Sequence, residues 1–185
     1  MEQALVFASI IVGVAVSDQV MSINRLLVAR NRVKWDWAPL ILALLVLLTN
    51  MQLWWSVASW PRTTITIGAF LPMFVLLIFL ALLSAASLPG DIDGDGEFDL
   101  RNNYDRHARY LWTLFSIALF WSLGMGTAEH FGRGSRMWEL SHRAIEIIPL
   151  AMMVSLIFVR ARWWLAICLA VLALGPLNWL TLSLS

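Results

Sequence analysis

The chain has 185 residues, of which 60% are hydrophobic and only 14% are charged, and its formal net charge is +1. A soluble domain is usually about half apolar and about a quarter charged, so this composition excludes a protein whose main solvent is water. The near-neutral charge provides no basic face for nucleic acid, and the single cysteine, Cys168, excludes a disulfide framework. We therefore expect an all-α, polytopic membrane protein that lies in the lipid bilayer as one integral domain over residues 1–185.

Six apolar segments have the length, or nearly the length, of a membrane-crossing helix, which takes about 20 mostly apolar residues. Four of them contain no Asp, Glu, Lys or Arg, at 37–61, 63–90, 110–128 and 163–185. The other two, 3–17 and 147–159, are shorter and can cross only if they carry charged residues into the membrane. We predict a bundle of six transmembrane helices, near residues 4–29, 38–60, 65–87, 104–127, 139–159 and 163–183.

The distribution of positive charge predicts the orientation of the chain. Nine Lys and Arg residues fall in or beside the connections after the first, third and fifth predicted helices, and four fall on the other side. Cytoplasmic connections carry the excess of Lys and Arg. We therefore expect a multi-pass protein of the cell membrane with both termini outside and with cytoplasmic loops at 30–37, 88–103 and 160–162.

The first predicted helix carries three polar side chains on one face, because Asp18, Ser22 and Arg25 are spaced i, i+4 and i+7. A carboxylate at membrane depth costs about 2.5–3.5 kcal/mol on insertion scales, so Asp18 should face protein or a wet cavity. A hydrogen-bonded structural acid and an ion or proton pathway both fit this position. Arg25 lies near the cytoplasmic end, where its side chain can reach the headgroups.

The connection between the third and fourth predicted helices is strongly acidic, with five carboxylates in nine residues: Asp91, Asp93, Asp95, Glu97 and Asp99. Residues 91–102 resemble the calcium-binding loop of EF-hand proteins, in which these acids match positions 1, 3, 5, 7 and 9 and Gly96 matches the turn glycine. The resemblance implies that the loop binds a divalent cation, Ca²⁺, through these residues.

The loop departs from the EF-hand pattern at position 12, where Asn102 stands in place of a bidentate Glu. The loss of two carboxylate oxygens and one charge should weaken cation binding considerably. A second interpretation is a polar, turn-rich connection in which Asp99 caps the following helix.

The fifth predicted helix carries a second charged face, with side chains at i, i+3, i+4 and i+7: Glu139, His142, Arg143 and Glu146. A salt-bridge network in the outer leaflet fits this pattern, since Glu139 precedes Arg143 by four residues. The same face could extend an intramembrane polar pathway from Asp18, or hold a transition metal together with Glu129 and His130.

Three functions from different classes fit these observations. The first is an ion- or proton-linked channel or transport component, built as a homo-oligomer or with a membrane-protein partner. The second is a non-catalytic accessory or assembly subunit of a larger membrane complex, and the third is a membrane metalloenzyme centred on His130, His142 and Glu146. The sequence contains no nucleophile elbow, P-loop or dinucleotide fingerprint, so no motif in it favours an enzyme. Of the three hypotheses we give the transport component priority.

The orientation can be tested by labelling introduced cysteines in intact cells, in a Cys168→Ser background. Cysteine at position 64 or 134 should react with an impermeant maleimide, because both positions are predicted to be outside. Cysteine at position 32 or 103 should react only after the cells are opened. Labelling at position 32 in intact cells would overturn the predicted orientation.

Overall fold

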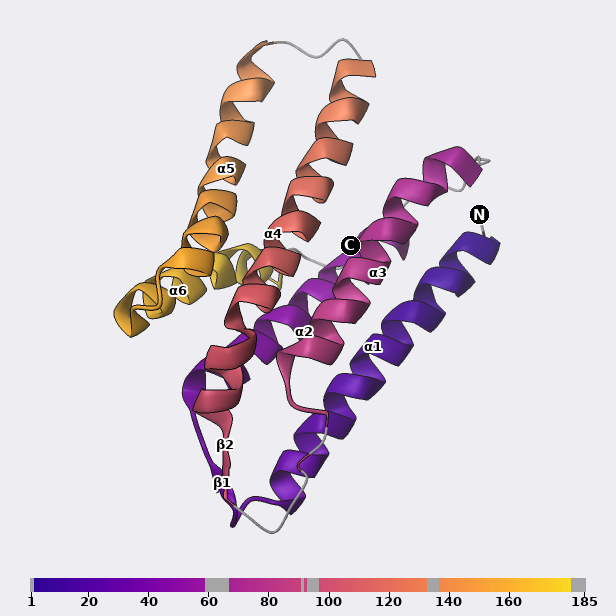
Figure 1. Ribbon diagram of the computed structural model, residues 1–185. Helices are drawn as coiled ribbons and strands as arrows, with labels where there is room; N and C mark the ends of the chain where they lie inside the picture. Colours follow the sequence, from indigo (N-terminus) through magenta and orange to yellow (C-terminus); the bar gives the residue numbers. More distant parts are fainter. Residues whose placement is uncertain (1, 59–66, 91, 93–96, 133–136, 181–185) are drawn as a thin grey trace.

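The computed structural model describes residues 2–58, 67–90, 92, 97–132 and 137–180, and for a few residues near helix ends, including 127–132 and 137–146, it describes the backbone alone. The described residues form a bundle of six helices (Figure 1), which confirms the all-α class. The helices are α1 (Glu2–Val28), α2 (Trp37–Ala58), α3 (Ile67–Ser87), α4 (Leu100–Gly132), α5 (Met137–Phe158) and α6 (Arg162–Leu180).

The helix that differs most from its predicted range is α4, which begins before residue 104 and continues beyond residue 127. Its start is fixed by Asp99, whose Oδ1 accepts a hydrogen bond from the backbone N–H of Asn102 at 3.1 Å and so caps the helix. With 33 residues, α4 is about 50 Å long, well over the roughly 30 Å of a bilayer core. The prediction had measured the apolar part of the helix, whereas its charged first turns extend past that part.

Within the described ranges, three helices have stretches long and apolar enough to cross a membrane: Leu5–Val28, Trp37–Ala58 and Phe70–Ser87. Two further apolar helices in the described residues, Ile147–Phe158 and Arg162–Asn178, are shorter. Large apolar side chains are exposed on several helices, among them Val14, Leu71, Phe120 and Leu174. Contiguous apolar surface of this kind is rare on soluble monomers, so the fold agrees with a membrane protein.

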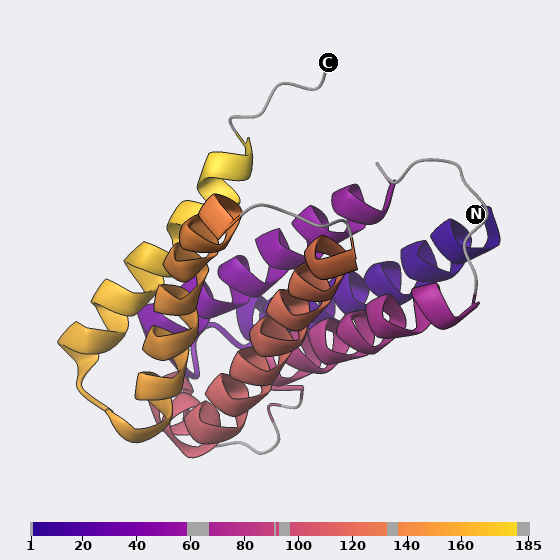
Figure 2. The ribbon, with the colours of Figure 1, turned by 90° about the horizontal axis from the view of Figure 1, so that it is seen from above.

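Five of the helices form a closed ring, and the sixth lies outside it. Helix α2 packs against α3, α3 against α4, α4 against α5, α5 against α6, and α6 returns to α2. Helix α1 lies along the outer side of α2 and α3 (Figures 1 and 2). The ring is filled at one end by a buried aromatic pair, in which Trp112 stacks on Phe115 with centroids 6.1 Å apart and donates from Nε1 to the Tyr104 hydroxyl at 2.9 Å.

Two very short strands join the connections at this same end. β1 (Val33–Lys34) pairs in parallel with β2 (Phe98–Asp99), with Val33 opposite Phe98. The backbone N–H of Phe98 also donates to the carbonyl of Arg32 at 2.8 Å. The pairing ties the connection after α1 to the connection before α4.

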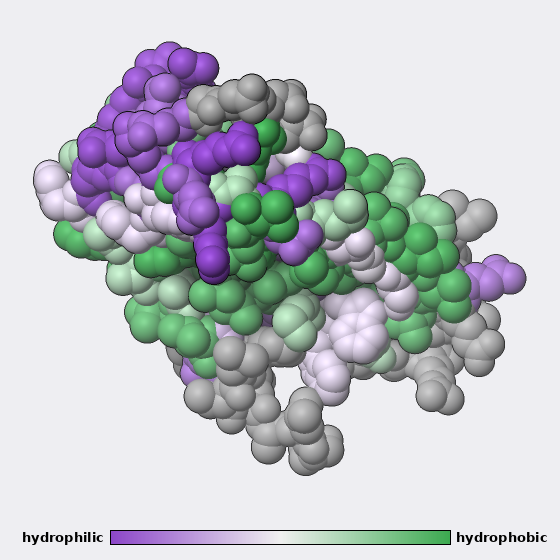
Figure 3. Space-filling view, turned by 90° about the horizontal axis from the view of Figure 1, so that it is seen from below, coloured by the Kyte–Doolittle hydropathy of each residue, from purple (hydrophilic) through white to green (hydrophobic). Residues whose placement is uncertain are grey.

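Charged residues gather at the end of the bundle that contains β1 and β2. We call residues 30–36, 97–109 and 160–162 the charged cap. Figure 3, which looks at this end from below, shows hydrophilic residues collected over it beside the apolar helix surfaces. Charged residues collected at an end of an apolar bundle are typical of helices whose apolar surfaces face lipid.

Within the charged cap, an ion pair joins the start of α6 to the start of α2. The guanidinium Nη1 of Arg162 donates to both carboxylate oxygens of Asp36, at 2.9 and 2.8 Å. Asp36 Oδ1 also accepts a hydrogen bond from the backbone N–H of Ala38 at 2.9 Å and so acts as the N-cap of α2. Burial works to raise the pKa of Asp36, but the Ala38 N–H and the Arg162 guanidinium outweigh it, so this pKa lies below its ordinary value.

The ion pair between Asp36 and Arg162 predicts a loss of stability at low pH that depends on the Asp36 carboxylate. Because the pKa of Asp36 is lower in the folded state than in the unfolded chain, its contribution is fully present above the ordinary value of 3.8 and is lost as the pH falls below it. Thermal melting in detergent should therefore show a steeper decline below that pH for the wild type than for Asp36→Asn.

Substitutions at Asp36 separate capping from ion pairing. Asp36→Ala should lower the free energy of unfolding by about 1 kcal/mol through the lost cap, and by more because Arg162 loses its closer carboxylate and keeps only Asp105, at 3.9 Å. Asp36→Asn keeps a capping oxygen and should fall between Asp36→Ala and the wild type. Equal melting temperatures for all three proteins would contradict a structural role for the pair.

Candidate functional site

The ends of the acidic loop are held by contacts with the first connection. Arg25 Nη1 donates to the carbonyl oxygen of Gly90, just before the loop. At the other end, Lys34 Nζ lies 2.5 Å from Glu97 Oε2, and this contact raises the pKa of Lys34. Both side chains of the Lys34–Glu97 pair are largely exposed, so the pair adds little stability but places the loop end beside β1.

Two of the five predicted cation ligands, Glu97 and Asp99, lie in the described part of the loop. The Glu97 carboxylate is paired with Lys34, whereas position 7 of an EF-hand loop binds the cation through its backbone carbonyl. The Asp99 carboxylate is used to cap α4. The predicted ligands Asp91, Asp93 and Asp95 lie outside the described residues, so their part in cation binding stays a prediction.

The polar face predicted on the first helix is divided into three environments. Ser22 is buried, Asp18 is half-buried, and Arg25 is exposed at the level of the loop. Among the residues that the structure describes, Asp18 has no hydrogen-bond or ion-pair partner. Asp18 is therefore a half-buried carboxyl that no cation from the described part of the chain neutralises.

Next to this face, buried amides and hydroxyls connect α1, α2 and α3. Gln19, with 1% of its surface exposed, donates from Nε2 to the Ala43 carbonyl at 2.8 Å and to Ser87 Oγ at 3.2 Å. Asn50, equally buried, donates from Nδ2 to Ser84 Oγ at 2.8 Å. Such bonds contribute about 0.6–2 kcal/mol each between membrane helices, so this seam fixes α1 on the outside of the ring.

The side chains predicted to act on the fifth helix cannot be placed. Glu139, His142, Arg143 and Glu146 belong to α5, but these side chains, with those of Glu129 and His130, lie outside the described residues. In the part of the chain that is described, no group of three or more His, Cys, Asp or Glu residues could hold a metal ion.

The two helices that carry the predicted charged faces pack on different neighbours. Helix α5 packs on α4 and α6, whereas α1 packs on α2 and α3, and α4 stands between α5 and α1 in both ribbon views (Figures 1 and 2).

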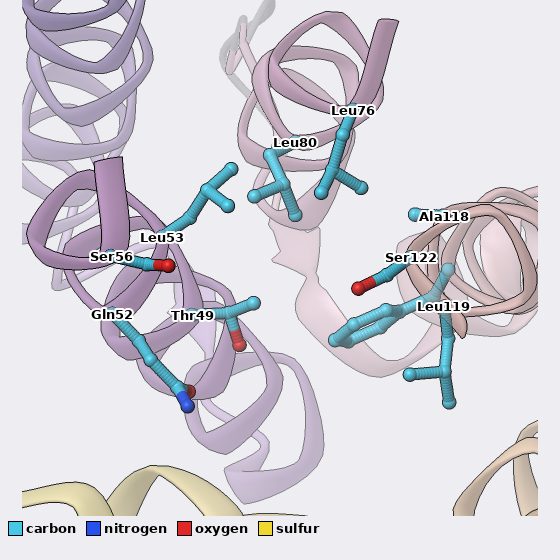
Figure 4. A pocket seen from close by; sticks show the side chains of 10 residues that line it. Thr49, Gln52, Leu53, Ser56, Leu76, Leu80, Ala118, Leu119 and Ser122 are labelled. Carbon is cyan, nitrogen blue, oxygen red and sulfur yellow. The ribbon is translucent and has the colours of Figure 1, made fainter. Parts of the chain in front are cut away.

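A cavity of about 310 Å³ lies inside the ring between α2, α3 and α4. Its polar lining consists of Thr49, Gln52 and Ser56 on α2 and Ser122 on α4, and Ser56 and Ser122 point toward each other across the space (Figure 4). The described remainder of the lining is apolar: Leu53, Leu76, Leu80, Phe115, Ala118 and Leu119. At about 30 Å³ per molecule, the cavity has room for about ten waters.

Beside this cavity, an indole from the middle of α4 contacts a carbonyl of α3. Trp121 Nε1 donates to the carbonyl oxygen of Pro72 at 2.8 Å. Trp121 lies in the middle of the uncharged segment 110–128, and this hydrogen bond gives its indole N–H a partner there.

The cavity was missed by the sequence analysis, although one signal for it is present. Thr49, Gln52 and Ser56 are spaced i, i+3 and i+7 on an otherwise apolar helix, which places their side chains on one face. The sequence does not reveal that Ser122, more than sixty residues later, lies opposite them. That fact depends on how α4 packs in the ring.

No family model matches the chain, and neither the curated proteins nor the solved structures include a match to it.

The acidic loop predicts weak binding of a divalent cation, and calorimetry with Ca²⁺ tests it. Wild-type protein should bind in the millimolar range, Asp93→Ala with Asp95→Ala should abolish binding, and Asn102→Glu should tighten it by restoring the bidentate ligand. Asp105→Ala, an acid of the same cap outside the loop, is the matched control. Unchanged calorimetry in the double variant would show that the resemblance to an EF-hand loop is accidental.

Proposed function

We propose that this protein is a multi-pass component of ion- or proton-linked transport in which all six helices cross the bilayer. The six-span topology is supported by the ring, because α4, α5 and α6 pack side by side with helices that are long and apolar enough to span. Exposed apolar side chains on these helices, such as Phe120 and Leu174, would otherwise face water.

The observation that carries the transport proposal is the polar-lined cavity inside the ring. A bundle that only held neighbouring subunits together would fill this space with apolar side chains at the packing density of a protein interior. Here an amide and three hydroxyls face a space of about 310 Å³ between helices. Polar residues inside a membrane are costly, and they are typical of substrate or ion pathways.

Asp18 is the residue that we assign to coupling with an ion or proton. Its carboxyl lies ten residues before the end of α1, about 15 Å along the helix axis, and therefore well inside the bilayer. It is half-buried, and no cation from the described part of the chain neutralises it. A carboxyl in this position can gain and lose a proton or cation without breaking an existing ion pair.

The proposal predicts that removing the charge of Asp18 changes flux more than stability. Asp18→Asn keeps the shape of the side chain, so expression and melting temperature should match the wild type. In liposomes with an internal pH dye and imposed ion gradients, the same variant should alter flux severalfold. Asp105→Asn, an exposed carboxyl in the charged cap, is the matched control and should leave flux unchanged.

Two results would contradict this function. Wild-type protein that carries no ion or proton flux in liposomes would end the transport proposal. A strong loss of melting temperature in Asp18→Asn would instead identify Asp18 as half of a buried pair, since breaking such a pair costs about 3–5 kcal/mol.

A further inference from the structure

The polar groups of the cavity lie on α2 and on the facing side of α4, and most of their hydrogen-bonding capacity is unused among the described residues. Thr49 Oγ1 donates to the Leu45 carbonyl at 2.8 Å, which leaves its lone pairs for a ligand. Gln52, Ser56 and Ser122 form no hydrogen bonds with the residues that the structure describes. The cavity therefore has both donors and acceptors to offer.

The described part of the lining disfavours a charged occupant. None of the described residues around the cavity carries a formal charge. An ion that left water for this space would have only neutral dipoles around it and an apolar wall on α3, and an unpaired ion in such surroundings is strongly disfavoured. The ion or proton that is coupled to transport would have to bind elsewhere, at a group such as the Asp18 carboxylate.

Two neutral occupants fit the lining poorly. A lipid tail would leave the amide of Gln52 and the hydroxyls of Ser56 and Ser122 against hydrocarbon without partners. Water alone would satisfy those groups but would stay in contact with the apolar side chains of α3 and α4, where it gains nothing. A molecule with both a polar edge and an apolar body satisfies both parts of the lining.

We propose that the cavity between α2, α3 and α4 binds a small neutral amphiphile, about the size of a single aromatic ring, with hydrogen-bonding groups at its edge. This inference rests on the proposed transport function for its biological role, since it names the class of cargo. The volume of about 310 Å³ is at the lower end of the range for small-molecule sites, about 300–1,000 Å³. Gln52 and Ser122 would bind the polar groups, and the leucines of α3 would contact the ring.

Binding can be measured by fluorine NMR with the protein in lipid nanodiscs, against empty nanodiscs to subtract partition into lipid. The three probes are 4-fluorophenol, fluorobenzene and 4-fluorobenzoate, which share a ring and differ in polarity and charge. We expect saturable binding of 4-fluorophenol and weaker or no saturable binding of the other two. Equal binding of fluorobenzene, tighter binding of 4-fluorobenzoate, or no saturable binding of 4-fluorophenol would each overturn the proposal.

Variants then assign the binding to this cavity. Gln52→Leu should weaken 4-fluorophenol binding by roughly threefold to tenfold, the value of one neutral hydrogen bond. Ala118→Trp should fill the space and remove binding, and Ala170→Trp, on an exposed position of α6, is its matched control. Ser122→Leu tests the same wall with a smaller change if the Trp variant does not fold. Unchanged binding in both Gln52→Leu and Ser122→Leu would overturn the assignment.

These measurements need no gradient, so they are independent of the transport assay. Saturable, Gln52-dependent binding by a protein that carries no ion or proton flux would support this inference while contradicting the transport function. Flux without 4-fluorophenol binding would contradict the inference and leave transport standing.

Discussion

Arg162, the first residue of α6, places its guanidinium against Asp36, which caps α2, although the two residues are 126 positions apart in the chain. Asp36 can accept from both the Ala38 N–H and Arg162 because a carboxylate has two oxygens with several lone pairs. The contact holds α6 beside α2, and it is this contact between helices that closes the ring. The cavity, the position of Ser122 and the site of α5 all follow from a ring that is closed rather than open.

Polar groups inside this bundle have two different roles. Gln19, Asn50, Ser84 and Ser87 are buried and bonded to other helices, so they determine which helices meet. Gln52 and Ser122 are also polar and lie between helices, yet they face a space instead of a partner. The two groups differ in what they need, because a polar side chain that has no protein partner in an apolar environment requires water or a ligand.

The helices could be predicted from the sequence because a membrane span is limited by charge, and gaps between charged residues are directly visible. The ends of α4 were predicted less well, since a capping carboxylate at Asp99 and several charged turns extend a helix without making it apolar. The strand pair at Val33 and Phe98 has too few residues to leave a periodic pattern. Contacts such as that of Asp36 with Arg162 depend on the packing of the whole bundle, and the spacing of residues in the sequence does not predict them.

The same limit applies to the candidate site. The spacing of Asp18, Ser22 and Arg25 correctly placed them along one helix, but their surroundings came from α2, α3 and the loop. Arg25 is engaged with Gly90, so the three residues do not act as one group. The opposed hydroxyls of Ser56 and Ser122 belong to helices separated by a long stretch of chain, and only the packing of those helices brings them across one space (Figure 4).

The return of α6 to α2 has a consequence for biosynthesis. Ribosomes release a chain from its N-terminus at about 5–20 residues per second, so α2 leaves the ribosome long before the helix that completes its surroundings. Until α6 arrives, the ring has a gap beside α2, and the acceptors of Asp36 have only the local Ala38 N–H. Contacts between residues distant in sequence form slowly, and the ring is therefore expected to be the last part of the tertiary structure to assemble. The hydrogen bonds of Gln19 and Asn50 that join α1, α2 and α3 need only the first half of the chain. These three helices can therefore pack first, and α4 to α6 then pack against them.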